Sequence, residues 1–407
     1  MSFPPDRTGV RLNMIDEGVA SLLLFSRNGV MSKCIVIWGG VAFLILSVAG
    51  FGGWVFSLPT SVATAAALPV PQRELDAILA SLRPKRARPL VAVIGINNAT
   101  ETTDYLMPTG ILRRANVADV MMLATGPGRV QLYPALAVEP DATIAAFDAA
   151  HPEGADYVIV PAMSRDDDPV VLAWLRNQAK KQAIIIGICA GAKVVAAAGL
   201  LDGKRATTHW YYRDEMLKSS PTIQYVANRR IVADEGVVTT TGITASMPMM
   251  LTLIEAIAGR TRAEAVGHDL GLEQWDARHA SGAFKFTRPF AMTVLTNRLA
   301  FWNREELGVH LEPGMDEVSL ALAADAWSRT YRSIIISYAG SSATVKSRNG
   351  VRVIPDRKDT AWPEDQLVPA TLSRRPAEAL DFTLKAIAAR HGTATRNVVA
   401  MELEYPR

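Results

Sequence analysis

The sequence predicts an α/β protein built on a parallel sheet with helices on both faces. Short runs that are apolar throughout, such as LVAVIGI at 90–96 and AIII at 183–186, have the length and character of strands buried on both faces. Segments with helical apolar spacing alternate with these runs, as in parallel sheets. The length of 407 residues exceeds one ordinary core, so a second globular unit and further segments are expected.

The first feature along the chain is a run without charge at 34–58, CIVIWGGVAFLILSVAGFGGWVFSL. As a helix, these 25 residues would cross about 30 Å of hydrocarbon. Arg27 and Lys33 precede the run, which favours a cytoplasmic segment at 1–33 and an external body. We therefore expect a single-pass protein of a bacterial-type inner membrane with a periplasmic globular part. The alternative is export after signal cleavage, because SVATAAALP offers small residues at the spacing of a cleavage site.

Residues 59–88 are rich in Ala, Pro and Arg and are predicted to be a linker, with one short helix candidate in RELDAILASL. The main domain is predicted at 89–276. Its strands are LVAVIGI, VMMLAT, DYVIVPA and the start of AIIIGICAGAKVVAAAGLL. Its helices are YLMPTGILRRA, the Ala-rich continuation of that last segment, SMPMMLTLIEAIAG and AEAVGHDL.

Residues 277–407 repeat part of this pattern. The segment at 316–337 resembles the first helix and second strand, and VKSRNGVRVIPD resembles VQLYPALAVEPD, which pairs Asp356 with Asp141. The helical segment at 377–406 resembles that at 247–270. We interpret 277–407 as a degenerate partial repeat without a cysteine, able to pack on the first copy as an intrachain pseudo-dimer. The alternative is a set of unrelated amphipathic helices of similar composition.

The segment IIIGICAGA places Cys189 on a sharp turn between a buried strand and a helix. Gly187 and Gly191 would permit close packing of the strand and the helix. N–H groups at the start of the helix favour a thiolate, so we expect the pKa of Cys189 to fall below its reference value of about 8.5. The same groups could hold a developing oxyanion. The alternative is that Cys189 is a small buried hydrophobe.

The block GICAGAKVVAAAGLLDGKRATTHW at 187–210 resembles the ThiJ/PfpI superfamily, which is class I glutamine amidotransferase-like. The similarity extends over about 89–275 and is closest to the amidotransferase-like domain of GlxA-type regulators. The resemblance implies a flavodoxin-like fold in which Cys189 is the reactive centre. It also implies that Asp104 in TDYLMP hydrogen-bonds the thiol within about 3 to 3.5 Å and that His209 in ATTHW lies nearby. On residues alone, Asp104 could be only a helix cap and His209 only structural.

Two positions depart from the family pattern. Ala162 and Met163 follow Pro161 where relatives have Pro-Gly-Gly, and Ala190 stands where isonitrile hydratases have a Thr. Ala162, Met163, Ala190 and Gly191 are therefore the expected oxyanion and pocket positions, in an altered form.

Composition excludes several classes of function. With 43 basic and 40 acidic residues the net charge is only +3, and no basic stripe indicates nucleic-acid binding. The two cysteines and the absence of a phosphate loop imply no metal and no cofactor. No helix-turn-helix pair of the kind found in GlxA-type regulators is evident. We expect a cysteine-dependent hydrolase or lyase acting on a small electrophilic carbonyl or amide, or alternatively a non-catalytic ligand-sensing module. The expected partners are a small molecule, the membrane through 34–58, and a second copy or the intrachain repeat.

Overall fold

The computed structural model describes residues 38, 43, 45–61, 66–341, 343–369 and 373–405. They belong to two units, one ending at Leu58 and one beginning at Pro59. In the first unit, residues 45–57 are helical. Among the described residues, no helix is long and apolar enough to cross a membrane. The predicted cytoplasmic segment, 1–33, lies outside the described residues, and so does part of the predicted span, 34–58.

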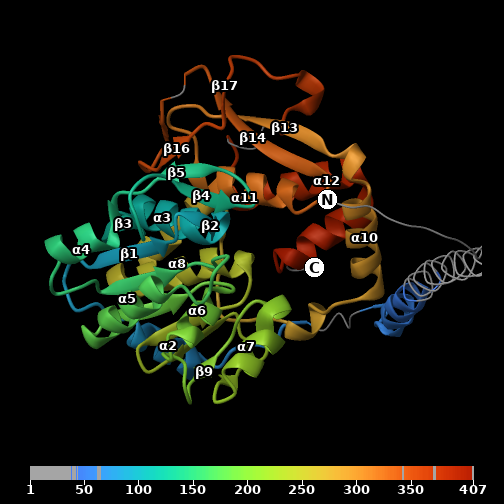
Figure 1. The fold of residues 1–407 in the computed structure, drawn as a ribbon. Helices are drawn as coiled ribbons and strands as arrows, with labels where there is room; N and C mark the ends of the chain where they lie inside the picture. The colour runs from blue at the N-terminus through green and yellow to red at the C-terminus, as the bar shows by residue number, and fades with distance from the viewer. Residues whose placement is uncertain are drawn as a thin grey trace, which may run out of the picture. The chain divides into compact units, whose positions relative to one another are not determined.

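The second unit is built on a seven-stranded sheet (Figure 1). Its strands, in spatial order, are β11 (Ile231–Asp234), β12 (Val237–Thr240), β8 (Ile184–Gly187), β7 (Tyr157–Val160), β1 (Leu90–Gly95), β3 (Asp119–Ala124) and β6 (Ala142–Thr143). Every pairing is parallel except that of β11 with β12. The order β3-β1-β7-β8-β12 is that of flavodoxin-like folds. The predicted parallel α/β sheet is therefore confirmed.

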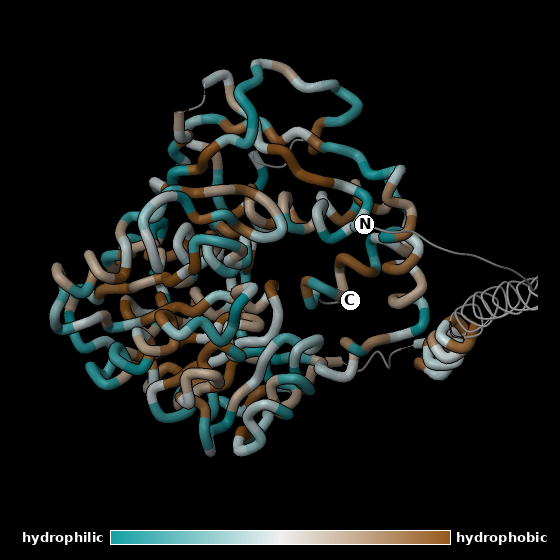
Figure 2. Tube along the Cα trace, viewed as in Figure 1, coloured by the Kyte–Doolittle hydropathy of each residue, from teal (hydrophilic) through white to brown (hydrophobic). Residues whose placement is uncertain are grey.

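Helices cover both faces of this sheet. Alternate side chains of β1 point to opposite faces, so Val91 and Val93 enter one apolar cluster while Ala92 and Ile94 enter another. The first cluster is completed by α3 (Thr102–Ala115), α8 (Ser246–Ala258) and α9 (Arg260–Leu270). The second is completed by α4 (Ile144–Ala150), α5 (Pro169–Lys180) and α6 (Gly191–Ala197). Apolar residues follow the strands and inner helix faces, and hydrophilic residues occupy the outer loops (Figure 2).

The segment predicted as a linker, 59–88, contains helix α2 (Gln72–Ser81), and this helix is part of the globular body. Ile78 and Leu82 are buried in the same apolar cluster as α8. Glu74 forms an ion pair with Arg229 at 2.7 Å. The apolar positions of RELDAILASL lie on one helix face, which explains why this segment packs instead of extending freely.

The C-terminal part forms a second, smaller set of strands and helices. A three-stranded parallel sheet has the order β13 (Glu305–His310), β14 (Ser333–Ala339) and β17 (Arg357–Lys358). Helix α11 (Glu317–Ser328) connects β13 to β14, as α3 connects β1 to β3. The antiparallel pair β15 (Val345–Lys346) and β16 (Arg352–Ile354) follows β14, as β4 (Val130–Tyr133) and β5 (Ala137–Glu139) follow β3.

The two parts are joined through corresponding elements. Strand β16 pairs antiparallel with β5, producing the five-stranded sheet β15-β16-β5-β4-β2, in which β2 is Asn98–Glu101. Helix α12 (Pro376–Glu402) is interrupted at Gly392, with φ 86° and ψ 160°. Gly259, with φ 83° and ψ 168°, separates α8 from α9 in the same way.

Hydrogen bonds at the second strand of each part also correspond. Asp141 accepts from the backbone N–H of Met122 at 2.7 Å, and its own N–H donates to the Met122 carbonyl at 2.8 Å. Asp356 makes the same two hydrogen bonds with Ser337, both at 2.9 Å. The two aspartates paired by sequence therefore have matching backbone partners.

The remaining helices and strands lie around this framework. They are β9 (Arg205–Ala206), α7 (Arg213–Ser219), β10 (Gln224–Tyr225) and α10 (Arg288–Leu299), with short 3-10 turns at 210–212, 243–245, 281–283, 301–303 and 364–366.

Candidate active site

The predicted turn at Cys189 is present. Strand β8 ends at Gly187 and helix α6 begins at Gly191. Cys189 lies between them with a φ of 55°, a left-handed conformation that is costly for a residue with a side chain. A Cβ atom at Gly191 would lie 1.9 Å from the carbonyl oxygen of Val160, so only glycine fits there. This close approach positions the start of α6 against the end of β7.

Threonine side chains hold both backbone groups of Cys189. Its N–H donates to Thr240 Oγ1 at 3.1 Å, at the end of β12. Its carbonyl accepts from Thr208 Oγ1 at 3.1 Å, in the loop that also carries His209. Two neighbouring segments of the fold thus maintain the strained conformation.

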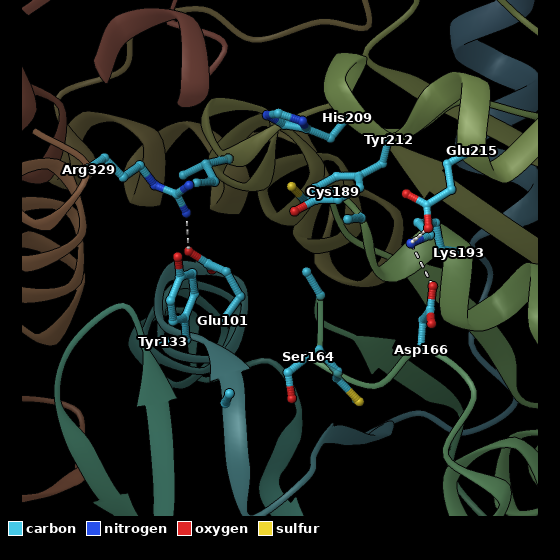
Figure 3. Close-up of a pocket in the computed structure, with 15 residues that line it drawn as sticks. Glu101, Tyr133, Ser164, Asp166, Cys189, Lys193, His209, Tyr212, Glu215 and Arg329 are labelled. Atoms are coloured by element: carbon cyan, nitrogen blue, oxygen red, sulfur yellow. Dashed lines mark hydrogen bonds and ion pairs between the residues drawn. The ribbon is translucent and has the colours of Figure 1, made fainter. Parts of the chain in front are cut away.

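Cys189 lines a pocket of about 430 Å³, although its own side chain is almost buried (Figure 3). Figure 3 shows the Arg329–Glu101 pair on one side of the pocket, Lys193 with Asp166 and Glu215 on the other, and Cys189 with Tyr212 between them. Met163, Ala190 and His209 also line the pocket. The volume is that of a small-molecule site.

Two carboxyl groups lie at the start of α3 beside this pocket. Asp104 is fully buried, and its Oδ2 accepts from the backbone N–H of Ala162 at 3.1 Å. Its Oδ1 has no hydrogen-bond partner among the described residues. Glu101 caps the helix, since its carboxylate accepts from the Asp104 N–H at 2.6 Å. Asp104 was predicted from the sequence but Glu101 was not, although an acidic residue directly before a helix is a signal for a cap.

A cation from the C-terminal part reaches the same pocket. Arg329 caps the C-terminal end of α11, and its Nη2 donates to Glu101 Oε1 at 2.9 Å. Its Nε donates to Asp325 at 2.7 Å, and its Nη1 lies 3.5 Å from a Glu402 oxygen. The sequence carries no local signal that would place Arg329 next to Glu101, 228 positions earlier.

Burial governs the protonation of these groups. Burial raises the pKa of Asp104 to about 7, and burial together with Asp104 raises the pKa of Glu101 well above its usual value. Burial and then the charges of Asp104 and Glu101 raise the pKa of the Cys189 thiol. The expected lowering of this pKa is therefore wrong in direction, because burial and the nearby carboxylates raise it. The raised pKa favours the protonated thiol at neutral pH.

His209 is committed to backbone partners. Its Nδ1 accepts from the Tyr211 N–H at 3.2 Å, so the proton lies on Nε2, which donates to the Glu402 carbonyl at 2.8 Å. Burial lowers the pKa of His209, which favours this neutral form. Among the described residues, no hydrogen bond joins the Cys189 sulfur to Asp104 or to His209. The structure brings the three predicted residues to one region without connecting them directly.

The predicted oxyanion positions differ in whether their backbone N–H groups already have an acceptor. The Ala162 N–H is taken by Asp104, and the Gly191 N–H donates to the Ile188 carbonyl at 2.7 Å. The Ala190 N–H has no acceptor among the described residues, and Ala190 lines the pocket. It is therefore the backbone donor at the turn that a ligand oxygen could use.

Lys193 forms the opposite rim, between Asp166 at 2.7 Å and Glu215 at 2.9 Å, with its Nζ 5.0 Å from the centre of the Tyr212 ring. In the described part of the chain, no group of three or more His, Cys, Asp or Glu side chains is arranged to hold a metal ion.

Comparison with known proteins supplies a family context. The sequence profile of the DJ-1/PfpI family matches residues 91–256. Isonitrile hydratase of Pseudomonas putida is 39% identical to this chain over 101 residues, which are 25% of this chain and 42% of that protein. The Parkinson disease protein 7 homolog of Danio rerio is 27% identical over 174 residues, which are 41% of this chain and 89% of that protein.

The HTH-type transcriptional regulator GlxA of Rhizobium meliloti is 24% identical over 265 residues, which are 62% of this chain and 76% of that protein. The chain thus spans less than half the length of the hydratase, and most of the length of the other two.

Proposed function

Because residues 91–256 form a DJ-1/PfpI family domain, we propose that the protein is a cysteine-dependent enzyme of the hydrolase or lyase type acting on a small electrophilic carbonyl or amide. The observation that best supports this proposal is the left-handed backbone conformation of Cys189. Two threonines hold this conformation, and Cys189 lines a pocket of about 430 Å³. A structural cysteine would not require a strained backbone that opens on a cavity.

Asp104, whose Oδ1 has no other hydrogen-bond partner among the described residues, would act as the base for the thiol once the two groups come within hydrogen-bond reach. With a pKa of about 7, its carboxyl exchanges protons near neutral pH, which suits a general base. The sulfur donates an electron pair to the electrophilic carbon, the carbonyl π pair moves to oxygen, and the thiol proton passes to Asp104. The Ala190 N–H would hold the oxyanion, and the proton would return from Asp104 to the leaving group or the alkoxide. His209, which the resemblance places near the thiol, would fix the Thr208 loop through its two backbone hydrogen bonds.

Turnover of a panel of aldehydes, amides and isonitriles tests this function. Purified protein should convert at least one class, and Cys189→Ala should abolish the conversion. Asp104→Asn, which keeps an acceptor for the Ala162 N–H but cannot take a proton, should lower the rate by roughly 100-fold or more. Conversion that survives in Cys189→Ala would refute the proposal.

A ligand-sensing module is the second candidate, and specific observations favour it. Burial raises the pKa of the thiol and so favours its protonated form, the Ala162 N–H is already engaged, and both nitrogens of His209 are occupied. In this case no substrate would be turned over, while a small ligand would raise the melting temperature equally in wild type and Cys189→Ala.

The organisation of the chain belongs to the same proposal. Residues 277–407 would be a degenerate second copy of the domain at 89–276, packed on it as an intrachain pseudo-dimer. The recurring order of strands and helices, the matched kinks at Gly259 and Gly392 and the matched partners of Asp141 and Asp356 support this. Since the pairing edge of β5 is covered by β16, the soluble body should be a monomer by light scattering. A stable homodimer would favour the other expected partner, a second copy of the chain.

Membrane attachment remains a proposal that rests on the uncharged run at 34–58. The full chain should stay with membranes after carbonate extraction, and a chain beginning at residue 59 should be soluble. Release of the unprocessed full chain would refute the anchor. Release after loss of about the first sixty residues would indicate a cleaved signal and export.

A further inference from the structure

We call residues 89–276 the first half of the second unit and residues 277–407 its C-terminal half. Two arginines, one from each half, form ion pairs with acidic residues of the other half. Arg114, in the last turn of α3, contacts Asp316, which caps the start of α11. Arg329, at the end of α11, contacts Glu101, which caps the start of α3, at 2.9 Å. Each helix thus offers a carboxylate at its start and an arginine at its end to the other helix.

The correspondence extends to sequence spacing and to a second acidic partner. Thirteen positions separate Glu101 from Arg114 and also Asp316 from Arg329. Arg114 lies 3.4 Å from Asp269, and Arg329 lies 3.5 Å from Glu402. These two acids each follow the glycine kink of their own half by ten positions, at 259 and 392. The two ion-pair clusters therefore have the same construction.

Among the described residues, only one of the clusters lies beside a thiol. Three positions after the capping acid, the first half has Asp104 and the second has Ser319. The pocket that Cys189 lines includes both Glu101 and Arg329, but neither Arg114 nor Asp316. The chain therefore contains one pair at the candidate active site and an equivalent pair away from it.

From this geometry we infer that Arg329, supplied by the C-terminal half, is a positioning residue of the Cys189 site. It holds the Glu101 carboxylate on the pocket wall and, through the hydrogen bond from the Asp104 N–H to Glu101, the start of the helix that carries Asp104. The C-terminal half thereby completes a site whose nucleophile lies in the first half. The catalytic meaning of this role rests on the proposed function, but its test does not require turnover.

The charges around the thiol give Arg329 a measurable effect. Burial raises the pKa of Cys189 most, the charges of Asp104, Glu101 and Glu404 raise it further, and Arg329 lowers it; Tyr212 also faces the sulfur. At Asp104, Arg329 lowers the pKa and Asp325 raises it, within the larger effect of burial. Arg329 is thus the cation that opposes these carboxylates. Its removal should move the ionisation of both Asp104 and Cys189 to higher pH.

The experiment measures alkylation of Cys189 by iodoacetamide against pH in the full chain. A Cys34→Ser background leaves one thiol, and Cys189→Ala gives the blank. In Arg329→Gln the inflection should rise by about one pH unit, so alkylation near neutral pH should fall roughly tenfold. Arg329→Lys, which restores the charge but not the planar fork, should lie between Arg329→Gln and wild type.

Arg114→Gln is the matched control, because it breaks the equivalent ion pair with Asp316 away from the thiol. It should lower the melting temperature and leave the alkylation profile unchanged. If Arg329→Gln does not fold, Arg329→Lys alone tests the inference. A raised inflection in its alkylation profile supports the inference, and an unchanged inflection contradicts it. An unchanged profile in the folded Arg329 variants, or the same shift in Arg114→Gln, would overturn the inference. Because alkylation needs no substrate, failure here is distinct from a lack of turnover.

Discussion

At the scale of single residues, chemistry could be predicted where it depends on neighbours in sequence. The strand, the glycines and the helix around Cys189 are contiguous, so the sharp turn followed from local pattern. The pKa of the thiol could not be inferred in the same way. It depends first on burial and then on the charges of Asp104 and Glu101, with Arg329 opposing them, and only tertiary packing sets this burial and brings these groups together. The engagement of His209 likewise depends on the Glu402 carbonyl, 193 positions later.

Gly191 gives the most direct residue-scale prediction. Gly191→Ala would place a Cβ 1.9 Å from the Val160 carbonyl oxygen, a backbone atom that cannot rotate away. We expect destabilisation of more than about 3 kcal/mol by urea unfolding, or no folded protein. Gly203→Ala is the control, because Gly203 has a φ of 72° but nothing near its Cβ position, so backbone strain alone should cost about 1 kcal/mol. Equal losses in the two variants would contradict the close-packed turn.

Asp104 should make the stability of the protein depend on pH. Burial raises its pKa to about 7 in the folded state, against about 3.9 when unfolded, so the folded state binds more protons between these values. Its contribution is fully present below about pH 4 and is lost as the pH rises through about 7. Asp104→Asn does not titrate at this position, so its free energy of unfolding should increase relative to that of wild type as the pH rises from 5 to 8. Asp119→Asn, which removes the charge of an exposed aspartate, is the control for a general effect of the lost charge. A constant difference for Asp104→Asn would argue against a buried titrating carboxyl.

At the scale of elements, strands were predicted correctly where the sequence has an uninterrupted apolar run. The runs at 90–96, 120–125, 156–162 and 183–186 became β1, β3, β7 and β8, each buried by helices on both faces. The antiparallel hairpin of β11 and β12 was not predicted, because IVADEGVVTT is short and its polar threonines obscure the apolar pattern. Those threonines include Thr240, which holds the Cys189 N–H.

Helix α2 gives an element-scale prediction, since it was expected to belong to a linker. Leu82, just after this helix, is fully buried in the cluster shared with α8. Leu82→Ala should therefore destabilise the protein by about 2–5 kcal/mol. Leu68→Ala changes an exposed leucine a short distance upstream and should stay within about 0.5 kcal/mol of wild type. Chemical unfolding measures both, and a neutral Leu82→Ala would mean that this segment is a linker after all.

At the scale of the whole molecule, the sequence indicated that residues 277–407 resemble the first half. It did not indicate which contacts join the two halves. Similar segments can be recognised within one chain, whereas contacts between them depend on how the halves meet. The ion pairs of Arg114 and Arg329, and the β5–β16 pairing, cross between the halves in both directions. A site that draws Cys189 from one half and Arg329 from the other therefore cannot be assembled from either segment alone.

The contacts of Glu404 with the first half test most directly how the two halves are joined. Glu404 is buried, and its carboxylate accepts from the N–H groups of Trp210 at 2.7 Å and Gly242 at 2.9 Å and contacts His279 Nε2 at 3.0 Å. Burial alone would raise its pKa, but the contact with His279 and the Gly242 N–H outweigh burial and hold it at about 2. The tail is thereby tied to the loop that carries His209.

Glu404→Gln should weaken this tie, because the amide offers one oxygen to two N–H donors and turns its own NH₂ toward one of them. We expect a loss of about 1–3 kcal/mol at pH 7 by urea unfolding. Since the folded pKa lies below the unfolded value of about 4.3, the advantage of wild type is present above that value and disappears as the pH falls toward 2. Glu312→Gln, at an exposed pair with His310, should change little at any pH. A Glu404→Gln deficit that does not shrink at low pH would show that the carboxylate charge is not what holds the tail to the first half.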